Sequence, residues 1–198
     1  MCFFKRFKIN RLNKKLRAFQ SARVHNPPGE EALKKELACY MKLAGLYHGL
    51  IGHKKYPFAR ELWLESYRGA ASIDDPESLF VFGKQMLEEG KFRAALQAEG
   101  LFASPSNERQ SNQLFEEAHA YLLAAEKLKH IQAKRLRGLA YINGWGVPAD
   151  KEQGFEWVVE SIEQENSWDK VPQIFASLGL NKPEFFSALA QRRHPATG

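Results

Sequence analysis

Apolar residues recur at every third or fourth position along most of this chain, and no segment sustains an apolar–polar alternation of period two. A spacing of three and four gathers apolar side chains on one face of an α-helix, so it predicts an all-α protein. Glycine, proline and aspartate signals divide the pattern into separate helices. The expected helices cover residues 30–50, 57–71, 76–90, 108–128, 130–142, 150–164 and 168–178, with a short helix after Pro183.

Residues 91–113 depart from this rhythm. We expect one helix to end at Gly90 and a short helix to follow over 92–98. The residues 100–107 contain Ser104-Pro105-Ser106, which is typical of a loop.

The clearest helix–turn–helix pattern lies in Ala133–Trp157. Gly144 and Gly146 permit the positive φ that ends a helix. Asp150 can accept the first hydrogen bonds of the helix that follows. Gly154 and the later aromatic residue would then face back toward the first helix. We therefore expect two antiparallel helices joined by a tight turn.

Small residues stand at matching places in the first helices of three helix pairs, namely Ala44, Gly83 and Gly138. A small residue lets the backbone of the second helix approach closely, and an aromatic side chain can cover the remaining gap. Tyr141 and Trp157 are the aromatic residues expected to do this in the third pair.

The combination of Gly138, Tyr141, Gly144, Gly146-Val147-Pro148, Asp150 and Trp157 resembles a Sel1-like repeat, a relative of the tetratricopeptide repeat. The resemblance implies an α-solenoid of about three antiparallel helix hairpins, since one repeat cannot bury its apolar face alone. The units would cover about residues 37–73, 77–128 and 130–165, with a cap over 167–190 and a tail over 191–198. It also implies a protein–protein adaptor, of the kind that bacteria use in signalling or in secretion and virulence assemblies.

A basic arm precedes these units. Residues 1–24 hold eight of the 29 Lys and Arg residues and none of the 23 acids. The basic residues are Lys5, Arg6, Lys8, Arg11, Lys14, Lys15, Arg17 and Arg23. Apolar residues lie between them at helical spacing: Phe4, Phe7, Leu12, Leu16 and Phe19. Pro27 and Pro28 disfavour helix around them, so the arm is expected to span about residues 1–29.

Three interpretations of the arm remain open. Its phenylalanines and leucines would make it a cap on the first repeat. As a basic amphipathic helix it would lie on an anionic membrane surface, with the cations from Lys5 to Arg17 as contacts. It would otherwise bind a partner, and nucleic acid is the weaker option because no nucleic-acid-binding module is recognisable.

A second basic stretch runs without an acid between Glu126 and Asp150. His130, Lys134 and Arg137 are spaced to share one helix face. In tetratricopeptide-like folds such faces line a concave groove. The sequence thus predicts a basic groove patch for an acidic peptide or protein segment, and a solvated helix face is the alternative.

Catalytic signatures are missing from the sequence: it has no Gly-x-Ser-x-Gly, phosphate loop, His-Glu-x-x-His or Cys-x-x-Cys. We expect neither an enzyme nor a bound cofactor or metal. Cys2 and Cys39 form no disulfide framework, which is typical of a reducing cytosol. The start of the chain lacks the apolar core of a signal peptide, so a cytoplasmic location is expected, with membrane association or non-Sec export left open.

Overall fold

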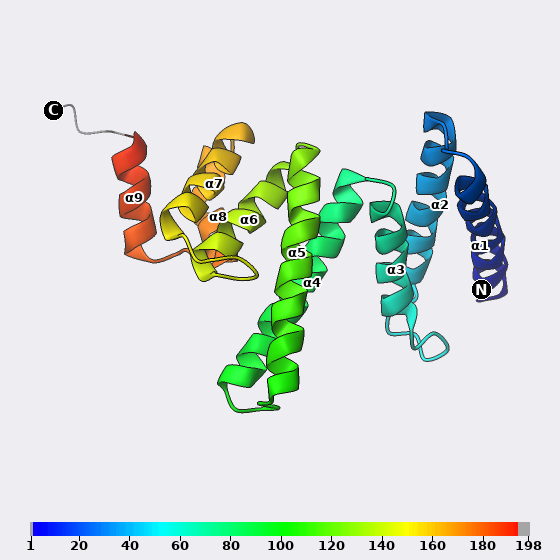
Figure 1. The fold of residues 1–198 in the computed structure, drawn as a ribbon, viewed down its shortest axis with the longest axis horizontal. Helices are drawn as coiled ribbons and strands as arrows, with labels where there is room; N and C mark the ends of the chain where they lie inside the picture. Colours follow the sequence, from blue (N-terminus) through cyan, green and yellow to red (C-terminus); the bar gives the residue numbers. More distant parts are fainter. Residues whose placement is uncertain (1, 194–198) are drawn as a thin grey trace.

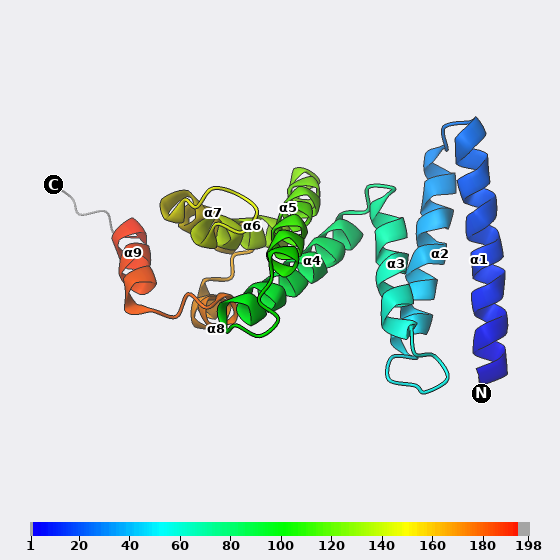
Figure 2. The ribbon, with the colours of Figure 1, turned by 60° about the horizontal axis from the view of Figure 1, so that its bottom comes forward.

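The computed structural model describes residues 2–193, and this part of the chain consists of nine α-helices and one short 3₁₀ helix. The all-α prediction is confirmed. The helices are α1 (Cys2–His25), α2 (Glu30–His48), α3 (Ala59–Ala71), α4 (Pro76–Ala98), α5 (Pro105–Lys127), α6 (Ile131–Asn143), α7 (Lys151–Gln164), η1 (Trp168–Lys170), α8 (Val171–Leu178) and α9 (Pro183–Arg193). Sequential helices pack as antiparallel pairs that follow one another along the molecule, from α1 at one end to α9 at the other (Figures 1 and 2).

The core is a row of three apolar clusters. The first joins α1 to α3, the second joins the end of α3 to α6, and the third joins α6 to α9. Leu136 and Trp145 pack against both the second and the third cluster. Each helix therefore buries its apolar face mainly against its neighbours in the sequence.

The turn between α6 and α7 forms as its glycines and aspartate predict. Gly144 has φ +72° and its N–H donates to the Ala140 carbonyl, which ends α6. Gly146 also has a positive φ, +70°. Asp150 caps α7 by accepting the Gln153 N–H at 3.0 Å. The end of α6, the turn and the start of α7 are therefore all determined by residues within this short segment.

The two helices of this pair meet through their glycines. A Cβ added to Gly138 would lie 2.5 Å from the Gly154 carbonyl oxygen, and one added to Gly154 would lie 2.5 Å from the Gly138 oxygen. Tyr141 packs edge-on against Trp157, with ring centroids 4.7 Å apart. The predicted close approach and its aromatic cover are both present.

Gly83 plays the corresponding part between α4 and α5, since its added Cβ would meet Leu122 and Tyr121 at 3.1 Å. In the pair α2–α3 the arrangement is reversed. The close glycine there is Gly69 of α3, which faces the ring of Tyr40 on α2.

The expected break at Gly90 is wrong, because α4 continues through it to Ala98. Gly90 serves helix packing instead of a turn: its added Cβ would lie 2.8 Å from the Phe115 ring, and its carbonyl accepts the Ser111 hydroxyl at 3.0 Å. The irregular stretch of sequence is therefore a lengthening of both helices. Figure 1 shows the resulting α4–α5 hairpin projecting past the other pairs.

Helix α1 docks on α2, as the cap interpretation requires, but through partly different residues. Ile9 and Leu16 are buried there, whereas Phe4 and Phe7 are 74% and 61% exposed. The expectation that these two phenylalanines belong to the packing face is wrong. At the other end of α1, Arg23 forms an ion pair with Glu36 at 3.1 Å.

The expected tail is also shorter at its start, because α9 continues through Arg193. The remainder of that predicted tail, residues 194–198, lies outside the described residues. None of the helices in residues 2–193 is both long and apolar enough to cross a membrane.

Gly138→Ala tests the close approach of α6 and α7. The added methyl group meets backbone that cannot rotate away, so we expect the free energy of unfolding to fall by about 1–3 kcal/mol. Urea unfolding followed by circular dichroism measures it. Gly45→Ala is the matched control, because nothing lies within 4 Å of its added Cβ, and removing a helix glycine should raise stability by about 0.5–1 kcal/mol. Equal stability of the two variants would contradict this packing.

Arg23→Ala tests the attachment of α1. Glu36 is only 1% exposed, so losing its partner leaves a buried carboxylate without an opposite charge, at a cost of about 3 kcal/mol. We expect faster hydrogen exchange across α1 and a lower unfolding midpoint. Arg17 is an exposed arginine on the same helix, so Arg17→Ala should change neither the hydrogen exchange of α1 nor the unfolding midpoint. The double variant Arg23→Leu/Glu36→Leu should recover much of the lost stability, because it leaves no buried carboxylate without a partner.

Candidate functional site

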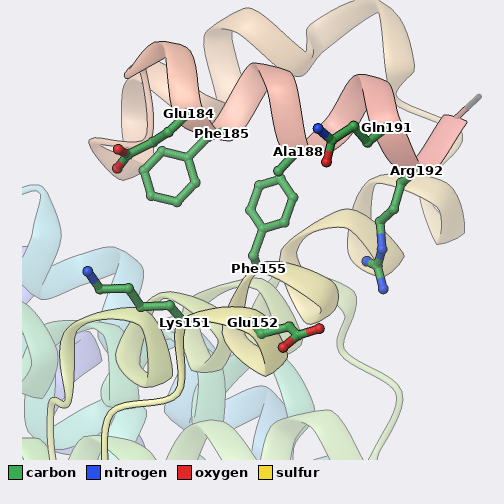
Figure 3. A pocket seen from close by; sticks show the side chains of 8 residues that line it. All are labelled: Lys151, Glu152, Phe155, Glu184, Phe185, Ala188, Gln191 and Arg192. Atoms are coloured by element: carbon green, nitrogen blue, oxygen red, sulfur yellow. The ribbon is translucent and has the colours of Figure 1, made fainter.

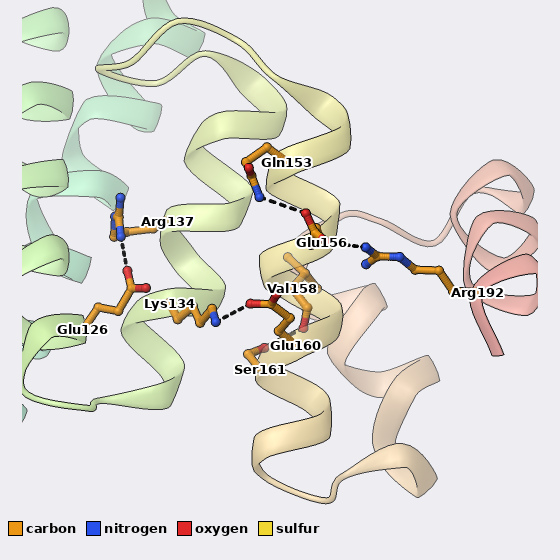
Figure 4. Close-up of polar contacts among 9 residues, drawn as sticks. All are labelled: Glu126, Lys134, Arg137, Gln153, Glu156, Val158, Glu160, Ser161 and Arg192. Atoms are coloured by element: carbon orange, nitrogen blue, oxygen red, sulfur yellow. Dashed lines mark hydrogen bonds and ion pairs between the residues drawn. The ribbon is translucent and has the colours of Figure 1, made fainter.

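The predicted groove residues His130, Lys134 and Arg137 each contact an acid of this chain. Lys134 pairs with Glu160 of α7, and Arg137 pairs with Glu126 of α5 (Figure 4). These acids lie on other helices. The sequence around the three residues contains no acid and therefore could not show that they have acidic partners. The predicted groove patch therefore consists of residues that already have acidic partners within this chain.

Arg137 is a packing residue as much as a charge. It is 7% exposed, and its guanidinium lies 4.6 Å from the centroid of the Trp157 ring. Such a cation–π contact, together with the Glu126 pair, holds α6 between α5 and α7. Position 137 is thus filled by a buried arginine whose charge is paired within the chain.

His130 also has a structural role, as the N-cap of α6. Its Nδ1 accepts the Ala133 N–H at 3.3 Å, its Nε2 lies 3.1 Å from a Glu77 oxygen, and its ring stacks on Phe80 at 4.3 Å. These contacts join α4 to α6. The three predicted residues lie at the start of α6 or within it, and their acidic partners lie on three different helices, α4, α7 and α5.

Helix α1 differs, because all but one of its Lys and Arg residues lack such partners in the described chain. Arg23 is the one basic residue of α1 for which the described residues supply an ion pair. The reason lies in α2, which runs antiparallel to α1: its acids Glu30 and Glu31 pair with Lys34 and Lys35. Residues 37–49, which face the first part of α1, contain no acid at all.

A groove of about 570 Å³ lies between α1 and α2, which we call the basic groove. Its lining residues are Lys8, Arg11, Leu12 and Lys15 from α1 and Lys42, Gly45 and Leu46 from α2. The four cations are exposed, and no ion pair joins them to a carboxylate of the described residues. The two leucines supply an apolar floor. Chemically, this groove suits a ligand that combines negative charge with an apolar surface.

Lys5 marks one end of the basic groove. Its Nζ lies 3.5 Å from the Gly49 carbonyl oxygen at the carboxyl end of α2, where a positive charge is favourable for the helix dipole. Arg6, Lys14 and Arg17 are exposed on other parts of α1. Of the seven cations predicted as anion contacts, Lys8, Arg11 and Lys15 therefore line the groove and the other four do not.

A second cleft, of about 610 Å³, lies between α7 and α9 (Figure 3). The rings of Phe155 and Phe185, 5.6 Å apart, form its apolar part. Its rim carries Lys151, Glu152, Glu184 and Arg192, so its charges balance. Arg192 also pairs with Glu156 and thereby helps attach α9 to α7 (Figure 4). Its lining contains no Ser, Thr, Cys or His, and its rim charges favour neither an anion nor a cation.

Buried titratable groups are scattered in the described part of the chain. Burial, followed by the nearby Arg137 charge, lowers the pKa of His119, whose Nδ1 has no hydrogen-bond partner in the structure. Cys39 is a buried free thiol in the first core cluster. Among the described residues, no group of three His, Cys, Asp or Glu side chains is placed to hold a metal ion. The basic groove is therefore the strongest candidate site.

Comparisons of this chain with protein-family models, with curated proteins and with solved structures find no match. The assignment of a function consequently depends on the geometry and charge of the surfaces described above.

Proposed function

We propose that this chain is a non-catalytic interaction scaffold, an α-solenoid of Sel1-like helix pairs that binds an acidic segment of a partner protein. The three antiparallel pairs α2–α3, α4–α5 and α6–α7 support the repeat architecture, as do the glycine contacts within them. Helix α1 would be the amino-terminal cap, and α8 and α9 the carboxyl-terminal cap. A cytoplasmic adaptor of bacterial signalling or secretion is the setting that the motif resemblance implies.

The basic groove is the observation that carries the proposed binding role. An amphipathic helix laid between α1 and α2 would place apolar residues over Leu12 and Leu46. Its acids would then meet Lys8, Lys15 and Lys42 along the rim. Because these cations have no carboxylate partner in the described chain, an incoming acid does not displace an existing ion pair. The patch at Lys134 and Arg137 lacks this advantage.

Selection of a phage-displayed random peptide library on the full chain tests the proposal. We expect the selected peptides to combine Asp or Glu with apolar residues at helical spacing. Fluorescence anisotropy of one such peptide should show at least about tenfold weaker binding to Arg11→Glu and Lys42→Glu, because each reversal puts like charges in contact. Gly45→Phe should weaken binding similarly by filling the groove without changing its charge.

Lys170→Glu supplies the control, since it makes the same charge change at an exposed site far along the chain. It should bind the peptide as the wild type does. Peptides without acidic enrichment, or equal binding by Arg11→Glu and Lys170→Glu, would contradict the assignment of the groove.

A further inference from the structure

Several exposed apolar side chains gather on one side of the molecule. Successive helices alternate in direction, so the start of α1, the α2–α3 turn and the α4–α5 turn lie at corresponding ends of their helices. Figures 1 and 2 both show these three places on the lower side of the ribbon. We call this side the turn edge, defined by Phe4, Phe7, Ile51, Phe58, Leu101 and Phe102.

The exposure of these residues is large. Phe7 is 61% exposed, Phe58 68% and Phe102 79%. Single exposed apolar residues are ordinary on a protein surface. What distinguishes these is their position at one helix start and two turns that are distant in sequence and lie on one side of the fold, with two exposed apolar residues at each place.

The backbone of Phe102 has a conformation that is unfavourable for a residue with a side chain. Its φ is +60°, in the left-handed region that suits glycine, and it follows Gly100 at φ +75°. The turn around it is fixed by hydrogen bonds: the Gln97 side-chain oxygen accepts the Ser104 N–H at 2.9 Å and the Asn107 amide at 3.2 Å. Phe102 is thus an exposed aromatic residue in a strained turn. Because strained residues are often found at functional sites, this observation points to a function for the ring.

Cations accompany the apolar side chains at two of the three places. Arg6 lies beside Phe7, and Lys54 and Lys55 lie in the turn that also carries Phe58. All three are exposed, and the described residues supply no ion pair for them. The turn edge is thus apolar at its tips and positive around two of them.

We propose that the turn edge binds the surface of an anionic phospholipid membrane. The apolar tips would enter the interface between headgroups and acyl chains, while Arg6, Lys54 and Lys55 contact anionic headgroups. A bilayer accepts separate side chains at any spacing, whereas a folded partner would need a matching pocket for each turn. The charge and the separation of the three tips therefore favour lipid over protein.

This surface is distinct from the basic groove, whose lining runs along the flank of α1 and α2. A membrane-bound scaffold would keep that groove open to its peptide. The two proposals can therefore fail separately, and Gly45→Phe should leave membrane binding unchanged while it weakens peptide binding.

Co-sedimentation with vesicles tests the membrane proposal. We expect the full chain to sediment with vesicles of phosphatidylserine and phosphatidylcholine, and far less with phosphatidylcholine alone. Phe7→Ser, Phe58→Ser and Phe102→Gly should each lower the partition coefficient by about tenfold, the usual effect of withdrawing one aromatic ring. Phe102→Gly suits its backbone, so this variant separates lost binding from lost folding.

Val24→Ser and Leu128→Ser are the matched controls, because both side chains are exposed but lie at the opposite ends of their helices, away from the turn edge. Both should sediment as the wild type does. The proposal is overturned if the wild type does not bind anionic vesicles, or if the turn-edge variants bind as well as the controls. It is equally overturned if light scattering shows that Phe58→Ser and Phe102→Gly break up a self-association of the wild type while vesicle binding is absent.

Discussion

The burial of each helix against its neighbours in the sequence is the interaction on which the rest of this structure depends. The described helices do not surround one central core, and their apolar side chains form three clusters in a row. The contact between Gly138 and Gly154 shows how tightly two neighbours meet, since either Cβ would strike the opposite backbone. Packing of this kind fixes each pair locally and leaves long flanks and turn ends exposed along the molecule.

Electrostatics then divide these exposed surfaces into two kinds. Along α6, cations and acids from adjacent helices meet and neutralise each other, as Lys134 does with Glu160 and Arg137 with Glu126. Along the first part of α1 this does not happen, because the facing residues 37–49 of the chain contain no acid. Unpaired positive charge is therefore concentrated on α1, and both proposed binding surfaces involve this helix.

The sequence alone predicted the turn, the helix cap and the aromatic contact of the α6–α7 pair correctly. The positive-φ glycines at 144 and 146, the Asp150 cap and the contact of Tyr141 with Trp157 all depend on residues a few positions apart. It failed at Gly90, because a glycine that ends a helix and one that accommodates a neighbouring ring look the same in sequence. It also placed Phe4 and Phe7 in the packing face of α1, since helical spacing alone does not choose between two adjacent apolar faces.

The sequence by itself determined that this chain is helical, where most of its helices begin and end, and that its first segment carries the excess positive charge. Those properties follow from spacing, capping and composition, which act within a few residues. Only the tertiary structure decided which cations are neutralised and which apolar side chains remain exposed. Both outcomes depend on which residues the neighbouring helices bring together. Arg137 and Glu126, like the three places of the turn edge, are related by packing and not by sequence spacing.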